Sequence, residues 1–135
     1  MFKTIFRLAI VAMSLSACSG VDHSDIGGPS SAEIRAQKAE NLALWETRQS
    51  ISYAGKPFEI AVASSKAFAF IAPGSDGFSY TPTDLEAAAR SFTGCQAKYA
   101  AGILTMVGGY SASSDLRSIQ SKVKSFKYWR TDLTC

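Results

Sequence analysis

The sequence is poor in the residue types on which most catalytic sites depend. It has one histidine, His23, and three cysteines among its 135 residues. His23 lies in the polar stretch SGVDHSDIGGPSS, residues 19–31, which we expect to be a flexible tether. A Ser-His-Asp or Cys-His arrangement needs a histidine held within about 3 Å of the nucleophile. A single histidine in a tether supports neither arrangement.

The sequence also lacks the patterns of metal and phosphate sites. No group of histidine, cysteine and carboxylate residues has ligand spacing, and no glycine-rich loop carries the lysine of a P-loop. We therefore expect no metal and no cofactor. Asp76, Asp84 and Glu86 could supply an acid/base pair for glycan cleavage. The alternative is that Asp84 and Glu86 favour the positive end of a helix and that Asp76 belongs to a turn.

A strong net charge is absent as well. The formal net charge is +3, and loss of Lys3 and Arg7 with an amino-terminal signal would leave 12 basic against 11 acidic residues. A nearly neutral domain offers no electrostatic basis for binding nucleic acid. We therefore expect no nucleic-acid partner.

No apolar run reaches the ~20 residues of a membrane-spanning helix. The amino terminus MFKTIFRLAIVAMSLSAC has a shorter run, from Leu8 to Leu15, after two basic residues and before small ones. This layout is typical of an export signal. Conventional cleavage after Ala17 would place the bulky Leu15 where a small residue is favoured.

Leu15-Ser16-Ala17-Cys18 resembles the lipobox of bacterial lipoproteins. The resemblance implies that residues 1–17 are a signal peptide, that Cys18 is joined to diacylglycerol, and that its new amine is acylated. Two or three acyl chains would hold the chain stably at a membrane. Ser19, in place of aspartate, implies the outer membrane, with the domain facing the periplasm. A soluble exported protein is the alternative.

Two cysteines remain once Cys18 carries lipid. An even number of cysteines in an oxidising compartment favours a disulfide between Cys95 and Cys135. A reactive cysteine is the alternative, although no histidine lies near either position. Thr93-Gly94-Cys95 and Leu133-Thr134-Cys135 also resemble segments of small bacterial envelope lipoproteins. That resemblance implies a disulfide and no activity.

The length and the patterning predict a single α+β domain over residues 32–135, with an antiparallel sheet and two or three helices. Ser30 and Glu33 have capping-box spacing, Thr81-Pro82 is a helix start, and Gly94 a helix stop. We expect helices at 31–42, 82–93 and 115–124, strands at 45–53, 58–62, 66–72 and 127–135, and one or two strands within 96–107. The expected apolar helix faces are Leu85, Ala88, Ala89 and Phe92 in one helix, and Leu116, Ile119 and Val123, continued by Phe126, in the other.

One segment combines basic and aromatic residues. Between positions 117 and 130 there are five basic residues and no acidic one, with aromatics interleaved. Such a mixture can contact anionic headgroups, lipopolysaccharide phosphates or cell-wall carboxylates. The candidate binding surface consists of Arg117, Lys122, Lys124, Lys127, Tyr128, Trp129 and Arg130. The alternative is that the aromatics enter the core and the lysines only solvate the surface.

Together these features predict a lipid-anchored cell-envelope protein that acts as a non-catalytic binding or accessory component. Its expected partners are the membrane, through the lipid on Cys18, and another envelope protein or a cell-wall component. A periplasmic inhibitor of cell-wall-degrading enzymes would share the small size, the export signal and the disulfide. A small hydrolase is a further alternative.

Overall fold

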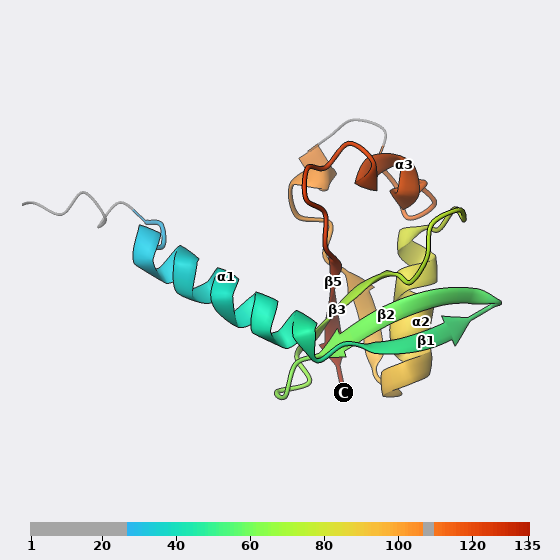
Figure 1. Cartoon of the computed structure of the whole chain (residues 1–135), viewed down its shortest axis with the longest axis horizontal. Coiled ribbons are helices and arrows are strands. Elements are labelled where there is room, and N and C mark those ends of the chain that lie inside the picture. Colours follow the sequence, from blue (N-terminus) through green and yellow to red (C-terminus); the bar gives the residue numbers. More distant parts are fainter. Residues whose placement is uncertain (1–26, 107–109) are drawn as a thin grey trace, which may run out of the picture.

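Five antiparallel strands form one sheet in the order β1-β2-β3-β5-β4 (Figure 1). The computed structural model describes residues 27–106 and 110–135. The elements are α1 (Ser31–Glu46), β1 (Gln49–Tyr53), β2 (Lys56–Val62), β3 (Phe68–Pro73), α2 (Pro82–Thr93), β4 (Gln96–Tyr99), the 3₁₀ helix η2 (Gly102–Met106), α3 (Leu116–Gln120) and β5 (Trp129–Thr134). The predicted small α+β domain with an antiparallel sheet is confirmed.

Both long helices begin at the predicted caps. The Ser30 hydroxyl accepts from the Glu33 backbone N–H at 3.2 Å, and the Ser30 N–H donates to the Glu33 carboxylate at 2.6 Å. These hydrogen bonds lower the pKa of Glu33. Thr81 caps α2 in the same way through Asp84. Gly94 ends α2 with φ = 73°, a left-handed conformation that glycine adopts without strain.

The first three strands form an antiparallel meander. Ala54 and Gly55 join β1 to β2 with φ values of 49° and 74°, as in the two-residue turns that match the twist of a hairpin. The third strand begins at Phe68 and not at residue 66 as predicted. Lys66 has φ = 56° and lies in the preceding turn, because the chain must reverse there before it can pair with β2.

The inner face of the sheet packs against α2. Its core comprises side chains of the sheet, α2 and the segments near α3, namely Phe58, Ile60, Ala69, Ile71, Tyr80, Leu85, Ala88, Ala89, Cys95, Ala97, Tyr99, Leu116 and Leu133. Three of the four residues predicted for the apolar face of α2 are fully buried. The prediction is wrong for Phe92, which is 42% exposed, because α2 reaches the margin of the sheet in its last turn.

The outer face of the sheet holds a second, smaller cluster around Trp45, Ala61, Phe70 and Ala72. Trp45 is 7% exposed and belongs to α1, so the strand predicted for residues 45–53 begins only at Gln49. The residues before it are good helix formers, and Trp45 is held against the sheet as part of a helix. In Figure 1, α1 stands out from the remainder of the fold, and residues 31–40 are exposed.

Two further predicted boundaries are wrong. Residues 102–106 form a 3₁₀ helix and not a strand, because the chain leaves the extended conformation at Gly102, whose φ is 53°. The pairing of β4 with β5 ends at Tyr99 and is followed by one backbone bond from Ala100 N to the Arg130 carbonyl. The third helix ends at Gln120, and Val123 is 46% exposed in the turns that follow. The Ser121 hydroxyl donates to the Ser118 carbonyl, a local bond of the kind that competes with helix continuation.

A hydrogen-bond relay joins α3 to the core. Trp129 Nε1 donates to the Tyr80 hydroxyl at 2.8 Å, and that hydroxyl donates to Gln120 Oε1. Tyr80 is 1% exposed. The relay therefore passes through a buried hydroxyl on its way from Trp129 in β5 to Gln120, the last residue of α3. A backbone bond from Leu116 N to Tyr80 O at 2.9 Å supports the same contact.

We predict that Tyr80→Phe lowers the free energy of unfolding by about 1–3 kcal/mol, because it leaves the Trp129 N–H and the Gln120 amide oxygen unpaired in partly buried positions. Urea unfolding with the disulfide intact measures this loss. Tyr53→Phe is the control, since the described residues offer the Tyr53 hydroxyl no hydrogen bond. Equal losses in the two variants would contradict the relay's role.

Candidate functional site

The structure separates the seven residues of the predicted binding surface. Lys124, Lys127 and Tyr128 line one cleft. Arg117 lies on α3 beside a small depression that also contains Asp76, and Lys122 is exposed in the turn after α3. Neither Arg117 nor Lys122 lines the cleft.

Trp129 and Tyr128 lie on opposite faces of the sheet. Trp129 points to the inner face, where its ring lies 5.9 Å from that of Tyr99 and its N–H bonds to Tyr80. Tyr128 lies on the outer face, stacked on Phe70 with ring centroids 4.0 Å apart. Tyr128 directly precedes β5, and the two rings pack into the clusters on opposite faces of the sheet, so of the two only Tyr128 shares a surface with the lysines.

Arg130 also lies on the outer face. Its guanidinium lies over the Phe68 ring at 4.2 Å, and its Nε donates to Asp132 at 2.9 Å. Because both groups are about half exposed, the ion pair contributes little to stability. The Arg130 charge is therefore partly neutralised within the strand.

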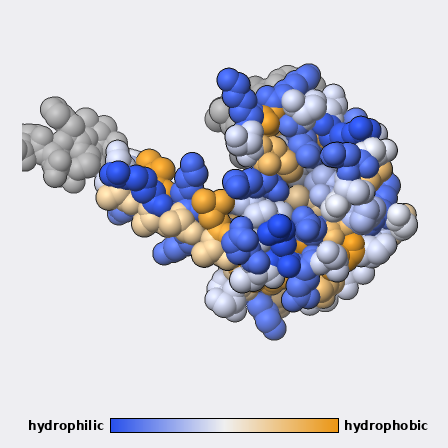
Figure 2. Space-filling model, in the orientation of Figure 1, coloured by the Kyte–Doolittle hydropathy of each residue, from blue (hydrophilic) through white to orange (hydrophobic). Residues whose placement is uncertain are grey.

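The cleft has a volume of about 380 Å³ and lies between α1 and residues 123–128. Lys38 and Leu42 form its α1 wall, and Val123, Lys124, Ser125, Phe126, Lys127 and Tyr128 form the other. Figure 2 shows the recess where α1 meets the body of the domain. The cleft is the place where basic and aromatic side chains of the predicted surface do converge.

Sequence reasoning missed Lys38 and Leu42. Their spacing with Trp45 was the available signal, since residues three and four apart share one side of a helix. That signal was hidden because Trp45 also fits the period-two pattern of the following strand. The prediction assigned the tryptophan to the strand, which left the helix without a visible packing side.

The carboxylates considered for acid/base chemistry have structural partners. Asp84 caps α2 and lies 3.4 Å from Lys56 Nζ. The Glu86 carboxylate accepts from the Tyr99 backbone N–H at 2.9 Å, which occupies an outward N–H of the edge strand β4. Asp76 lies in the exposed loop after β3. Within residues 27–106 and 110–135, no group of three His, Cys, Asp or Glu side chains could hold a metal ion.

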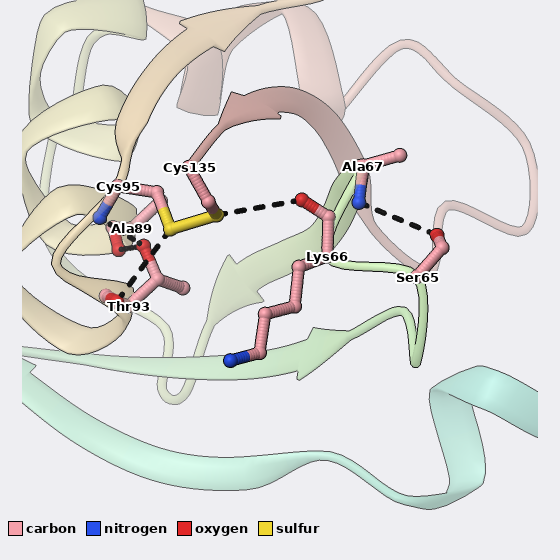
Figure 3. The surroundings of a disulfide bond; sticks show 7 residues. All are labelled: Ser65, Lys66, Ala67, Ala89, Thr93, Cys95 and Cys135. Atoms are coloured by element: carbon pink, nitrogen blue, oxygen red, sulfur yellow. Dashed lines mark hydrogen bonds between the residues drawn. A yellow bond between two sulfur atoms is a disulfide. The ribbon is translucent and has the colours of Figure 1, made fainter.

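Cys95 and Cys135 form a disulfide with an S–S distance of 2.00 Å (Figure 3). The Thr93 hydroxyl donates to the Ala89 carbonyl at 2.7 Å and accepts from the Cys95 N–H at 3.1 Å, so the end of α2 positions Cys95. Cys135 Sγ lies 3.6 Å from the Lys66 carbonyl oxygen. The bond ties the end of β5 to the end of α2, as predicted.

Buried tyrosines have raised pKa values. Burial raises the pKa of Tyr80 to about 12, against a smaller lowering by its bond to Trp129. Burial also raises the pKa of Tyr99, with a further contribution from the nearby Tyr110. The Tyr99 hydroxyl is buried and has no hydrogen-bond partner in the described part of the chain. Both side chains are therefore neutral in the folded protein at all ordinary pH values.

Comparison with family models, curated proteins and solved structures found no match to this chain. The predicted signal peptide, Cys18 and His23 lie outside the described residues. None of the described helices has the length and hydrophobicity needed to cross a membrane.

We predict that replacing both cysteines, Cys95→Ala with Cys135→Ala, lowers the free energy of unfolding by about 4 kcal/mol on the chain-entropy model. The physical reason is the larger conformational freedom of the unfolded chain, because the bond joins residues 40 positions apart. Urea unfolding of the two forms measures the difference. A loss below roughly 1 kcal/mol would contradict a stabilising role for the bond.

We also predict that stability falls with rising pH above the ordinary tyrosine pKa of 10.0. The unfolded chain releases its tyrosine protons there, whereas folded Tyr80 keeps its proton up to about pH 12. Between the unfolded and folded pKa values, each such tyrosine lowers the free energy of unfolding by about 1.4 kcal/mol per pH unit, and below this window it has no effect. Urea unfolding across the window should give a shallower slope for Tyr80→Phe. An unchanged slope would contradict the assignment.

Proposed function

We propose that this chain is a lipid-anchored, non-catalytic component of a bacterial cell envelope, which presents a binding surface to another envelope molecule. The observation that carries the proposal is the use of the three cysteines. Cys95 and Cys135 are joined to each other, which leaves Cys18 as the remaining cysteine of the chain, at the end of the lipobox-like segment.

The disulfide supports export independently of the amino-terminal motif. Structural disulfides form and persist in oxidising compartments and are rare in the cytosol. The export-signal pattern and the disulfide therefore support the same location, although they lie in different parts of the sequence. Ser19 favours the outer membrane over the inner membrane within the lipoprotein resemblance.

The shape of the domain suits a tethered role. From Ser31 to Glu46, α1 has 16 residues, which corresponds to about 24 Å. Its first ten residues are exposed, and the sheet holds it at its carboxyl end through Trp45. On the proposed anchor at Cys18, α1 would act as a stiff spacer between the lipid and the sheet.

The hydrogen-bond partners of the polar side chains favour a binding role over catalysis. Asp84 and Glu86 each bond to a backbone N–H that needs a partner. Within the described ranges, Lys38, Lys124 and Lys127 of the cleft form no salt bridge, and free ammonium groups of this kind suit the recognition of an anion.

We predict that Cys18→Ser abolishes lipid attachment, because the thioether cannot form. The variant should then be either soluble or an uncleaved precursor that keeps its signal peptide. Labelling with a fatty acid, followed by fractionation and intact-mass measurement, tests this outcome. The matched control replaces Cys95 and Cys135 by serine, and we expect it to keep its lipid. Unchanged mass and fractionation of Cys18→Ser would overturn the proposal.

A further inference from the structure

One side of α1 is buried at its carboxyl end and exposed toward its amino end. Ile34, Lys38, Leu42 and Trp45 lie three or four residues apart and share one side of the helix. Trp45 is buried in the outer-face cluster, whereas Ile34 is 54% exposed. Hydrophobic side chains on α1 are visible in Figure 2. The same side of α1 is therefore buried at Trp45, half-buried at Leu42 on the wall of the cleft, and exposed at Ile34 beyond it.

The opposite wall is built on packed aromatic rings. The Tyr128 ring stacks on Phe70 and lies 5.2 Å from the Trp45 ring. The Phe126 ring lies 4.7 Å from that of Trp129. Because these rings belong to the two clusters that hold the sheet, the apolar surface of this wall is held in place before any ligand binds.

Only one sign of charge lines the cleft. Lys38, Lys124 and Lys127 contribute to its walls, and no acidic residue does. None of the three lysines takes part in a salt bridge within the described ranges. Three ammonium groups around one recess repel each other, and an anion bound between them would remove that repulsion.

The backbone at Ser125 is unusual. Its φ is 55°, a left-handed conformation that is costly for residues other than glycine. The neighbours on both sides, Lys124 and Phe126, line the cleft. Ala54 and Lys66 have similar φ values, but they lie in the reversals between β1 and β2 and between β2 and β3. Ser125 lies outside any β-hairpin of the described strands. This left-handed residue lies between Lys124 and Phe126, which both line the cleft.

We propose that the cleft between α1 and residues 123–128 binds an anionic amphiphile, a molecule with a phosphate or carboxylate head group and an apolar chain. The head group lies among Lys38, Lys124 and Lys127, and the chain contacts Leu42, Val123 and Phe126. The volume of about 380 Å³ is at the small end of the range for ligand sites, about 300–1,000 Å³. This inference rests on the proposed binding role and names the ligand class.

The apolar wall distinguishes this ligand from a simple anion. Inorganic phosphate would pair with the lysines but leave Leu42, Val123 and Phe126 exposed. A neutral amphiphile would cover the apolar wall and leave the lysines unpaired. Burying an apolar chain contributes about 25 cal/mol for each Å² removed from water, so the combination binds better than either part.

The test uses the intact chain with isotope-labelled methyl groups, held by its lipid in phosphatidylcholine nanodiscs. Octyl phosphate is titrated into this sample. Nuclear magnetic resonance then reports the Leu42 and Val123 methyl groups, which separates binding in the cleft from partition into the bilayer. Octyl glucoside supplies the same chain without charge, and inorganic phosphate supplies charge without the chain. A chain found to carry no lipid is titrated without the nanodisc, so this proposal and the lipid anchor fail separately.

We expect saturable shifts of both methyl groups with octyl phosphate, and binding of the two comparison compounds that is at least about tenfold weaker. The double variant Lys124→Glu with Lys127→Glu should lower the affinity for octyl phosphate about tenfold or more. The matched control, Arg90→Glu with Lys98→Glu, changes the net charge equally at exposed positions on α2 and β4, away from the cleft, and should shift affinity less than about twofold.

Three results would overturn the proposal. The first is the absence of saturable methyl shifts with octyl phosphate. The second is binding of octyl glucoside or inorganic phosphate that equals binding of octyl phosphate. The third is an equal loss of affinity in the two double variants, which would show a general effect of net charge.

Discussion

The disulfide between Cys95 and Cys135 is the constraint on which the remainder of the account depends. It closes a loop that contains β4, η2, α3, the cleft wall and β5. Besides this bond, the end of β5 is held by its ladders with β3 and β4, by the Leu133 N–H bond to Ala67 and by the packing of Leu133 in the core. The disulfide leaves Cys18 as the remaining cysteine of the sequence, and structural disulfides of this kind are typical of oxidising compartments.

The two faces of the sheet have different tasks. The inner face packs on α2 and forms the main core, with Tyr80 and Trp129 joining α3 to it through hydrogen bonds. The outer face carries the aromatic cluster that holds Trp45. Because Trp45 lies near the end of α1, that contact fixes the helix at one end only, and this geometry creates both the proposed spacer and the cleft.

Local signals in the sequence predicted much of the fold correctly. The caps at Ser30 and Thr81 and the stop at Gly94 depend on residues close together in the chain, so local chemistry determines them. Tertiary contacts decided the failures. Trp45 fits a strand pattern by its neighbours, but its packing on Phe70 and Tyr128 makes it the end of a helix.

The candidate site was predictable only in part for the same reason. Lys124, Lys127 and Tyr128 were visible as a basic-aromatic segment, whereas Lys38 joins them across the fold from a separate helix. Conversely, Trp129 and Tyr128 are neighbours in sequence at the start of β5, but they pack into clusters on different faces of the sheet. No periodicity within the segment could show where the second wall of the cleft would come from.

In this account the domain works at a membrane surface, with a lipid at one end, a helical spacer next, and a basic apolar cleft at the junction with the sheet. The most direct measurement of its central claim is mass spectrometry of the amino-terminal peptide of the chain isolated from its own envelope. The account predicts a peptide that starts at Cys18 and carries diacylglycerol on sulfur and an acyl chain on its amine. A peptide that starts elsewhere, or a Cys18 with a free thiol, would contradict it.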